Sequence, residues 1–219
     1  MTEVKICGLT DPAAAETCAA LGADAIGCVF YPKSPRYVSD DRAREIVSAL
    51  PIQSRVMPVG VFVDEPVSAI LARVDYCGLR GVQLHGHEGP EIVDRLTAEG
   101  LRVIKGLYTS RPPHLSEAER FRPSGFLVEA GRGKLPGGNA EVWDWGGVRD
   151  FGDRYPFVLA GGLTPENVAD AAAAARPDAV DVSSGVESAP GVKDLDRVRA
   201  FLEAIRDINP QRPLRRIFT

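Results

Sequence analysis

Residues 156–186 read PFVLAGGLTPENVADAAAAARPDAVDVSSGV and hold one complete repeat of strand, loop, helix and strand. The apolar run at 156–161 ends in two glycines, and the triplet Thr-Pro-Glu at 164–166 has the residues typical of a helix N-terminus. An alanine-rich stretch follows, and a second apolar run begins at residue 179. Two strands joined by a helical crossover are predicted to lie parallel in one sheet.

The same alternation of strands and helices runs through most of the 219 residues. Eight β-rich runs are predicted at 4–9, 24–30, 56–63, 81–85, 102–107, 125–129, 156–161 and 179–184. Nearly all are separated by segments long enough for a helix. Eight βα repeats close naturally into a barrel, so we predict one α/β domain, a (βα)8 TIM barrel over residues 1–208. We expect residues 209–219 to form a loose, solvated C-terminal tail.

An open doubly wound sheet is the second architecture that fits this alternation. It is disfavoured because no G-x-G-x-x-G follows the first strand. The net charge of −4 and the lack of a Lys/Arg-rich block argue against nucleic acid or an anionic membrane as a partner. With no apolar run of about 18 residues and no signal-peptide pattern, we expect a cytoplasmic protein.

The four cysteines show no C-x-x-C spacing and no accompanying pair of histidines. A zinc site is therefore not expected, and neither is a disulfide framework in a chain of this kind. In a TIM barrel the chemistry lies at the C-terminal ends of the strands and in the loops that follow. The strand list thus becomes a list of candidate site residues.

The loops after the last two strands predict a phosphate site. The segments AGGLTPENV (160–168) and DVSSGVE (181–187) are rich in glycine, which lets a backbone approach a ligand closely. Barrels often bind phosphate with these two loops. Ordinary tight turns remain the alternative. The comparable ends of the third and fourth strands lack a glycine pair, so one phosphate site is expected.

Cys7 and Glu129 are candidates for acid–base chemistry because each ends a predicted strand. A thiol becomes a base when nearby cations lower its pKa, and Lys5 lies on the same strand face. A carboxylic acid in a poorly solvated pocket has a raised pKa and can donate a proton. A buried structural thiol and an exposed loop carboxylate are the alternatives. Arg36, in a loop that contains two prolines, suits a carboxylate ligand, and His85 is either structural or functional.

Several segments together resemble one enzyme family in order and spacing. They are VKICGLT (4–10), GADAIGCVFYPKSPRYVS (22–39), GVFVDE (60–65), GVQLHG (81–86), LAGGLTPENV (159–168) and AVDVSSGVE (179–187). Over residues 4–205 the chain resembles the phosphoribosylanthranilate isomerases of tryptophan biosynthesis.

The resemblance implies a cofactor-free Amadori rearrangement, without a metal, on a small (βα)8 barrel. An acid protonates the furanose oxygen of N-(5-phosphoribosyl)anthranilate, the ring opens to an iminium, and a base removes the C2′ proton. The product is 1-(2-carboxyphenylamino)-1-deoxyribulose 5-phosphate. By the same resemblance Cys7 is the base, Arg36 contacts the anthranilate and Asp181 orients the substrate, with Lys5 and His85 as further substrate-binding candidates. The phosphate-binding positions that it implies are Gly161, Gly162, Ser184 and Gly185.

The chain departs from the family where the general acid is expected. The family has an aspartate at the end of the sixth strand, and this chain has Glu129, whose side chain is one methylene longer. The glycine-rich loop that follows reads GGNA at 137–140, and Trp-Asp-Trp at 143–145 replaces Phe-Asp-Trp. Three functions stay open: the isomerase with glutamate as acid, a diverged enzyme acting on a related phosphosugar amine, and a non-catalytic phosphosugar-binding protein.

The related isomerase of histidine synthesis is disfavoured, because it would use paired aspartates and two phosphate sites. A cysteine on the first strand and a single Gly-Gly loop do not fit that pattern. We expect the protein to be a monomer or a homodimer and to bind a small phosphosugar substrate.

Overall fold

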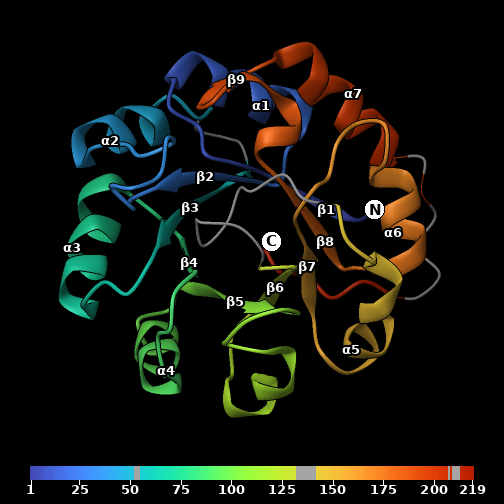
Figure 1. The fold of residues 1–219 in the computed structure, drawn as a ribbon. Coiled ribbons are helices and arrows are strands. Elements are labelled where there is room, and N and C mark those ends of the chain that lie inside the picture. The colour runs from blue at the N-terminus through green and yellow to red at the C-terminus, as the bar shows by residue number, and fades with distance from the viewer. Residues whose placement is uncertain (52–54, 132–141, 207, 209–212) are drawn as a thin grey trace.

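Eight parallel strands form a closed barrel in the computed structural model of the chain (Figure 1). The structure describes residues 1–51, 55–131, 142–206, 208 and 213–219. The strands are β1 (Glu3–Cys7), β2 (Ala25–Val29), β3 (Met57–Phe62), β4 (Gly81–Leu84), β5 (Arg102–Tyr108), β6 (Gly125–Glu129), β7 (Phe157–Leu159) and β8 (Ala179–Val182). They lie in sequence order around the ring, and β8 pairs with β1. The predicted TIM barrel is confirmed.

Helices surround the barrel, and one connection differs from the expected pattern. The elements outside the barrel are α1 (Pro12–Leu21), α2 (Asp40–Ser48), α3 (Val67–Cys77), α4 (Pro90–Ala98), η1 (Leu115–Arg120), η2 (Trp145–Val148), α5 (Arg149–Arg154), α6 (Val168–Ala175), η3 (Ser184–Val186) and α7 (Leu195–Arg206), with a small hairpin of β9 (Glu187–Ala189) and β10 (Val192–Lys193). Between β5 and β6 lies only the 3-10 helix η1. Pro113 and Pro123 flank it, and the helix cannot extend through Pro123, because proline lacks the backbone donor that a helix interior needs.

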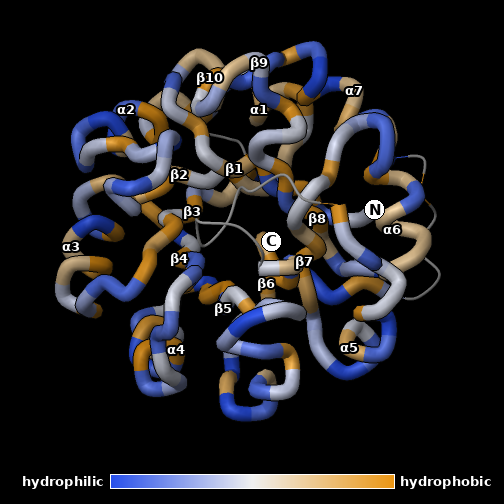
Figure 2. The backbone as a smooth tube through the Cα atoms, in the orientation of Figure 1, coloured by the Kyte–Doolittle hydropathy of each residue, from blue (hydrophilic) through white to orange (hydrophobic). Residues whose placement is uncertain are grey.

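Burial differs between the strands and the helices. All five residues of β1 are buried, as are all those of β2, β3 and β6, because helices cover the outside of the ring and side chains fill its inside. Each helix turns one apolar stripe inward; α7 buries Val198, Phe201, Leu202 and Ile205. Figure 2 shows hydrophobic residues along strands such as β3 and β5, and alternating hydrophilic and hydrophobic residues along the surrounding helices.

Closure of the barrel brings the first and last strands together. Lys5 on β1 is the register partner of Asp181 on β8, 176 residues away in sequence. On the other side of β1, Cys7 is the partner of Gly27 on β2. The end of β1 is therefore the meeting point of the two ends of the chain.

The C-terminal segment 213–219 packs into the barrel, so the predicted loose tail is wrong for these residues. Ile217 and Phe218 are buried in one apolar cluster with strand residues such as Met57 and Leu127. Figure 1 shows the C-terminus in the middle of the ring of strands. The hydrophobic effect explains the difference, because burial of two large apolar side chains outweighs the solvation of the neighbouring arginines. Residues 209–212 of the predicted tail lie outside the described residues.

The backbone of this segment is held by acidic side chains at the N-terminal ends of the strands. Glu3 accepts hydrogen bonds from the backbone N–H groups of Ile217 (2.7 Å) and Phe218 (3.2 Å) and from the hydroxyl of Thr219 (2.8 Å). Asp178 forms an ion pair with Arg215 at 2.7 Å. Within the described residues, none of the helices is long and apolar enough to cross a membrane.

Candidate active site at the C-terminal mouth of the barrel

Charged and polar side chains lie buried toward the C-terminal ends of the strands. A buried charge is costly unless it is paired or hydrogen-bonded. A cluster of buried charged side chains is therefore a candidate functional site. The set contains Lys5, Arg36, Gln83, His85, Glu88, Lys105, Glu129, Asp181 and Lys193.

Cys7 lies beside a buried ion pair. The Nζ of Lys5 donates a hydrogen bond of 2.8 Å to Oδ1 of Asp181, and the Lys5 side chain is completely buried. Burial raises the pKa of the Cys7 thiol, whereas the positive charge of Lys5 works in the opposite direction. Although burial opposes it, the charges of Asp181 and Cys7 hold the pKa of Lys5 above its ordinary range. Lys5 is therefore a permanent cation next to the thiol and stabilises its thiolate form.

A glycine on the neighbouring strand leaves room for this arrangement. A Cβ atom at Gly27 would lie 2.8 Å from Sγ of Cys7 and 3.2 Å from Cε of Lys5. Side chains do not tolerate the first of these distances, so any larger residue here would displace the thiol. Sequence reasoning missed Gly27, because nothing in a strand sequence tells which residue faces it across the sheet.

Glu129 ends β6 and faces His85, which follows β4. Its Oε1 lies 3.4 Å from Nε2 of His85, a close electrostatic contact rather than a well-formed hydrogen bond. The amide nitrogen of Gln83 lies 3.1 Å from Nδ1 of the same imidazole, and the hydroxyl of Tyr108 donates to the His85 carbonyl oxygen at 2.7 Å. Glu129 is only 6% exposed. Its Oε1 lacks a hydrogen-bond partner among the described residues, which leaves it available to a ligand.

Arg36 is held by an acidic residue that the sequence analysis did not single out. Its Nε and Nη2 atoms donate to the two carboxylate oxygens of Glu187 at 2.8 and 2.7 Å. Lys193 also donates to Glu187, at 2.7 Å, and to the Ser183 carbonyl oxygen at 3.1 Å. Although burial favours the neutral acid, the hydrogen bonds from Arg36 and the charge of Lys193 hold the pKa of Glu187 below its ordinary value.

This clamp restricts how Arg36 can bind a carboxylate. Glu187 occupies the Nε–Nη2 edge of the guanidinium, so a substrate carboxylate is confined to the edge that contains Nη1. Gly8 makes the arrangement possible. It has φ +73°, and a Cβ atom there would collide with Cδ of Arg36.

A pocket of about 310 Å³ lies between the loops after β7 and β8. Its lining includes three of the four residues predicted to bind phosphate, Gly162, Ser184 and Gly185. A Cβ atom at Gly185 would overlap the carbonyl oxygen of Leu163, so the two loops touch directly and only glycine fits. Two glycine-containing loops in contact around a small hollow are suited to an anion such as phosphate.

Gly161, the fourth of these residues, is not part of that lining. A Cβ atom there would lie 3.0 Å from Nε1 of Trp143 and 3.3 Å from Cβ of Glu129, so this glycine makes room beside the carboxylate. Trp143 donates to the Ala160 carbonyl oxygen at 3.0 Å and anchors the end of the loop after β6. The GGNA segment at 137–140 lies outside the described residues.

Lys105 forms a second buried ion pair that the sequence did not predict. Its Nζ donates to Glu88 at 2.6 Å and to the Gly86 carbonyl oxygen at 2.7 Å. Glu88 in turn accepts from the backbone N–H of Asp64 at 2.9 Å. Burial lowers the pKa of Lys105. All these contacts join β5 to the loops after β3 and β4, so we assign the pair a structural role.

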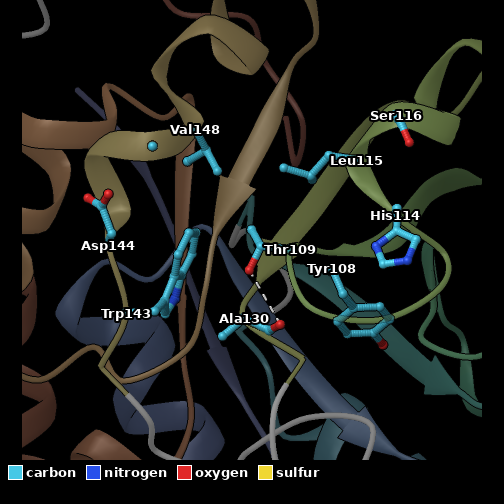
Figure 3. A pocket seen from close by; sticks show the side chains of 10 residues that line it. Tyr108, Thr109, His114, Leu115, Ser116, Ala130, Trp143, Asp144 and Val148 are labelled. Atoms are coloured by element: carbon cyan, nitrogen blue, oxygen red, sulfur yellow. Dashed lines mark hydrogen bonds between the residues drawn. The ribbon is translucent and has the colours of Figure 1, made fainter.

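A larger hollow of about 530 Å³ opens beside β5 and β6. Figure 3 shows Trp143 and Asp144 on one side of it and His114 and Ser116 on the other. Its polar groups already cap local structure: Asp144 accepts from the Gly146 N–H, and His114 takes part in the capping box of η1. Its lining includes neither Cys7, Arg36 nor Glu129. Among the described residues, no cluster of His, Cys, Asp and Glu is suited to hold a metal ion.

Comparison with known proteins identifies the family. The model of the family described as N-(5′-phosphoribosyl)anthranilate (PRA) isomerase matches residues 4–204. This chain belongs to the PRA isomerase family. It is 50% identical to the PRA isomerase of Desulfatibacillum aliphaticivorans over 201 residues, which is 92% of this chain and 91% of that one.

Solved structures of PRA isomerases have the same fold. The crystal structure of the Thermotoga maritima PRA isomerase superposes with a TM-score of 0.84 at 41% identity and covers 95% of this chain and 100% of that one. A structure of a PRA isomerase in complex with reduced 1-(o-carboxyphenylamino)-1-deoxyribulose 5-phosphate has a TM-score of 0.81 at 41% identity, with the same coverage. The family predicted from the sequence motifs is confirmed.

Proposed function

We propose that this chain isomerises N-(5′-phosphoribosyl)anthranilate to 1-(2-carboxyphenylamino)-1-deoxyribulose 5-phosphate. Membership of the PRA isomerase family supports this reaction. The observation in the structure that carries it is Cys7 at the seam of the barrel, next to the buried Lys5–Asp181 pair. A proton-abstracting base requires the thiolate, and the positive charge of Lys5 partly offsets the burial that raises the pKa of the Cys7 thiol.

In this proposal Glu129 is the acid and Cys7 the base. Glu129 protonates the furanose oxygen, and the C1′–O bond breaks to leave an iminium. Cys7 then removes the C2′ proton, and the electron pair forms the enolamine, which tautomerises to the aminoketose. In the barrel β7 and β8 separate β6 from β1, so the two groups reach a substrate from different sides. No cofactor is required, because protons alone move.

The remaining site residues hold the two ends of the substrate. The Nη1-containing edge of Arg36 binds the anthranilate carboxylate, and the loops around the 310 Å³ pocket bind the 5′-phosphate. Asp181 orients Lys5 and the substrate, and His85 supports Glu129. Fixation of both ends of the substrate positions its C1′–C2′ bond between acid and base, which accelerates both proton transfers.

The test follows the loss of phosphoribosylanthranilate fluorescence with purified protein. We expect turnover by the natural sequence and a loss of about 10²- to 10⁴-fold in kcat for Cys7→Ser, the range that one general base contributes. Cys18→Ser is the matched control, because Cys18 is a buried thiol of α1 outside the site. Absence of turnover by the natural sequence, or a Cys7→Ser variant at nearly full rate, contradicts the proposal.

Glu129 itself favours one alternative, an enzyme of the same chemistry with a related phosphosugar amine as substrate. Glutamate in place of aspartate changes the reach of the acid by one methylene, which is enough to suit a different aglycone. A panel of phosphoribosyl amines assayed beside phosphoribosylanthranilate decides between the two substrates. We further propose that the protein acts in the cytoplasm. We also propose that it is a monomer or a homodimer, and light scattering measures this oligomeric state.

A further inference from the structure

The pocket between the loops after β7 and β8 has two charged side chains in its lining, Glu187 and Arg197. The carboxylate of Glu187 faces two cations, since Arg36 and Lys193 both hydrogen-bond to it at 2.7–2.8 Å. Its negative charge is thus more than neutralised within the protein. The charge that characterises this pocket is therefore that of Arg197, which comes from the first turn of α7.

The guanidinium of Arg197 is anchored to a residue that lines the pocket, Gly185. Its Nε donates to the Gly185 carbonyl oxygen at 3.1 Å, and its Nη2 lies 3.3 Å from a carboxylate oxygen of Glu166. Nη1 has no hydrogen-bond partner among the described residues. The side chain of Arg197 is 38% exposed, and that of Glu166 is 66% exposed. An exposed ion pair of this kind is weak, so an incoming dianion can compete with Glu166 for the guanidinium.

We propose that Arg197 is the cationic ligand of the substrate phosphate in this protein. Glycine loops supply backbone N–H groups but no charge, and a phosphomonoester is a dianion near neutral pH. Arginine supplies charge and a planar fork that matches phosphate geometry. The bond to Gly185 presets the guanidinium at the edge of the pocket, so little side-chain freedom is lost on binding. This inference rests on the proposed use of the pocket for the 5′-phosphate.

The experiment measures binding of ribose 5-phosphate by isothermal titration calorimetry, with ribose as the phosphate-free control. We expect Arg197→Gln to raise the Kd of ribose 5-phosphate about tenfold, as loss of one charge-assisted hydrogen bond predicts. Arg199→Gln is the matched control: Arg199 lies two residues along α7, points to solvent and pairs with Asp196. Glu166→Gln should have the opposite sign and tighten binding about twofold, because it releases Arg197.

These measurements separate a phosphate ligand from a structural arginine. A Kd for Arg197→Gln within about twofold of the natural value overturns the proposal, as does an equal weakening by Arg199→Gln. With phosphoribosylanthranilate as substrate, Arg197→Gln should raise KM and leave kcat nearly unchanged, because the contact is equal in ground and transition states. The calorimetric result stands apart from turnover. If the protein binds ribose 5-phosphate through Arg197 but does not isomerise phosphoribosylanthranilate, the proposed function fails and this inference holds.

Discussion

The buried charged side chains at the two ends of the barrel have different kinds of partner. At the N-terminal end of the strands, Glu3 and Asp178 receive backbone and side-chain hydrogen bonds from the C-terminal segment, whose Ile217 and Phe218 fill the space inside the ring. At the C-terminal end, buried charges are held in ion pairs such as Lys5–Asp181 and Arg36–Glu187, and Glu187 also lines the 310 Å³ pocket.

The difference shows where stability and where function are located. A plug of apolar side chains, with Glu3 and Asp178 hydrogen-bonded to the same segment, gives a rigid base. The opposite end keeps a carboxylate oxygen of Glu129 without a hydrogen-bond partner among the described residues, and it keeps a thiol next to a cation. Such groups stabilise the fold little and are prepared for a ligand.

The largest expected effect is a loss of stability when residues 213–219, which fill the N-terminal end of the barrel, are removed. Ile217 and Phe218 are almost completely buried, and the burial of each contributes about 1.5–3 kcal/mol, so we expect a loss of about 3–6 kcal/mol in the free energy of unfolding. Thermal and urea denaturation measure this loss. Arg216→Gln is the control, because this side chain is more than half exposed.

The kcat of the truncated protein at 25 °C should stay near that of the full chain, since the segment touches the other end of the barrel. Truncation with unchanged stability would show that the segment does not hold the base together.

Substitutions of Glu129 test the C-terminal end of the barrel. They should change the activation free energy by an amount similar to the loss of stability on truncation, and should leave stability nearly unchanged. Glu129→Gln removes the acid and keeps the shape, and we expect a loss of about 10²- to 10⁴-fold in kcat. Glu129→Asp keeps the acid and should stay within about tenfold of the natural rate on phosphoribosylanthranilate. Steady-state fluorescence assays measure both. A large gain for Glu129→Asp would mean that the natural glutamate suits another substrate.

The pH dependence of stability compares the thiol at the mouth with one in the barrel wall. Burial raises the pKa of Cys7, and it raises that of Cys28 to about 12. A thiol with a raised pKa in the folded state keeps its proton there after the unfolded chain has lost it. Stability is therefore complete below the ordinary thiol pKa and falls as the pH rises above it. Each such thiol contributes a slope of about −1.4 kcal/mol per pH unit.

Urea denaturation between pH 9 and 10.5 should therefore show a shallower slope in Cys7→Ser. Cys28→Ser, on the adjacent strand β2, should change the slope in the same direction and by about 1.4 kcal/mol per pH unit, because the pKa of Cys28 is raised to about 12. An unchanged slope in Cys7→Ser alone would show that the mouth is well solvated in the free protein, and it would weaken the contrast between the two ends.

Much of the fold could be predicted from local patterns, because strands, helix caps and Gly-rich loops carry short-range signals. The run from Thr164 to Glu166 and the glycines at 161 and 162 indicate a βα unit from residue types and spacing alone. The packing of the C-terminal segment could not be predicted from local patterns, because the burial of Ile217 and Phe218 depends on strand residues far away in sequence.

The sequence by itself determined the family and the barrel, and it predicted Cys7, Arg36 and Glu129 as candidate site residues. Gly27, Glu187 and Arg197 were decided only by the tertiary structure. Gly27 matters because it faces a thiol across the sheet, and Glu187 because a loop brings it to Arg36, 151 residues away in sequence. Residue types and spacing encode what a side chain can do. Its partner, its burial and hence its charge state are set by closure of the barrel, which brings the first strand against the last.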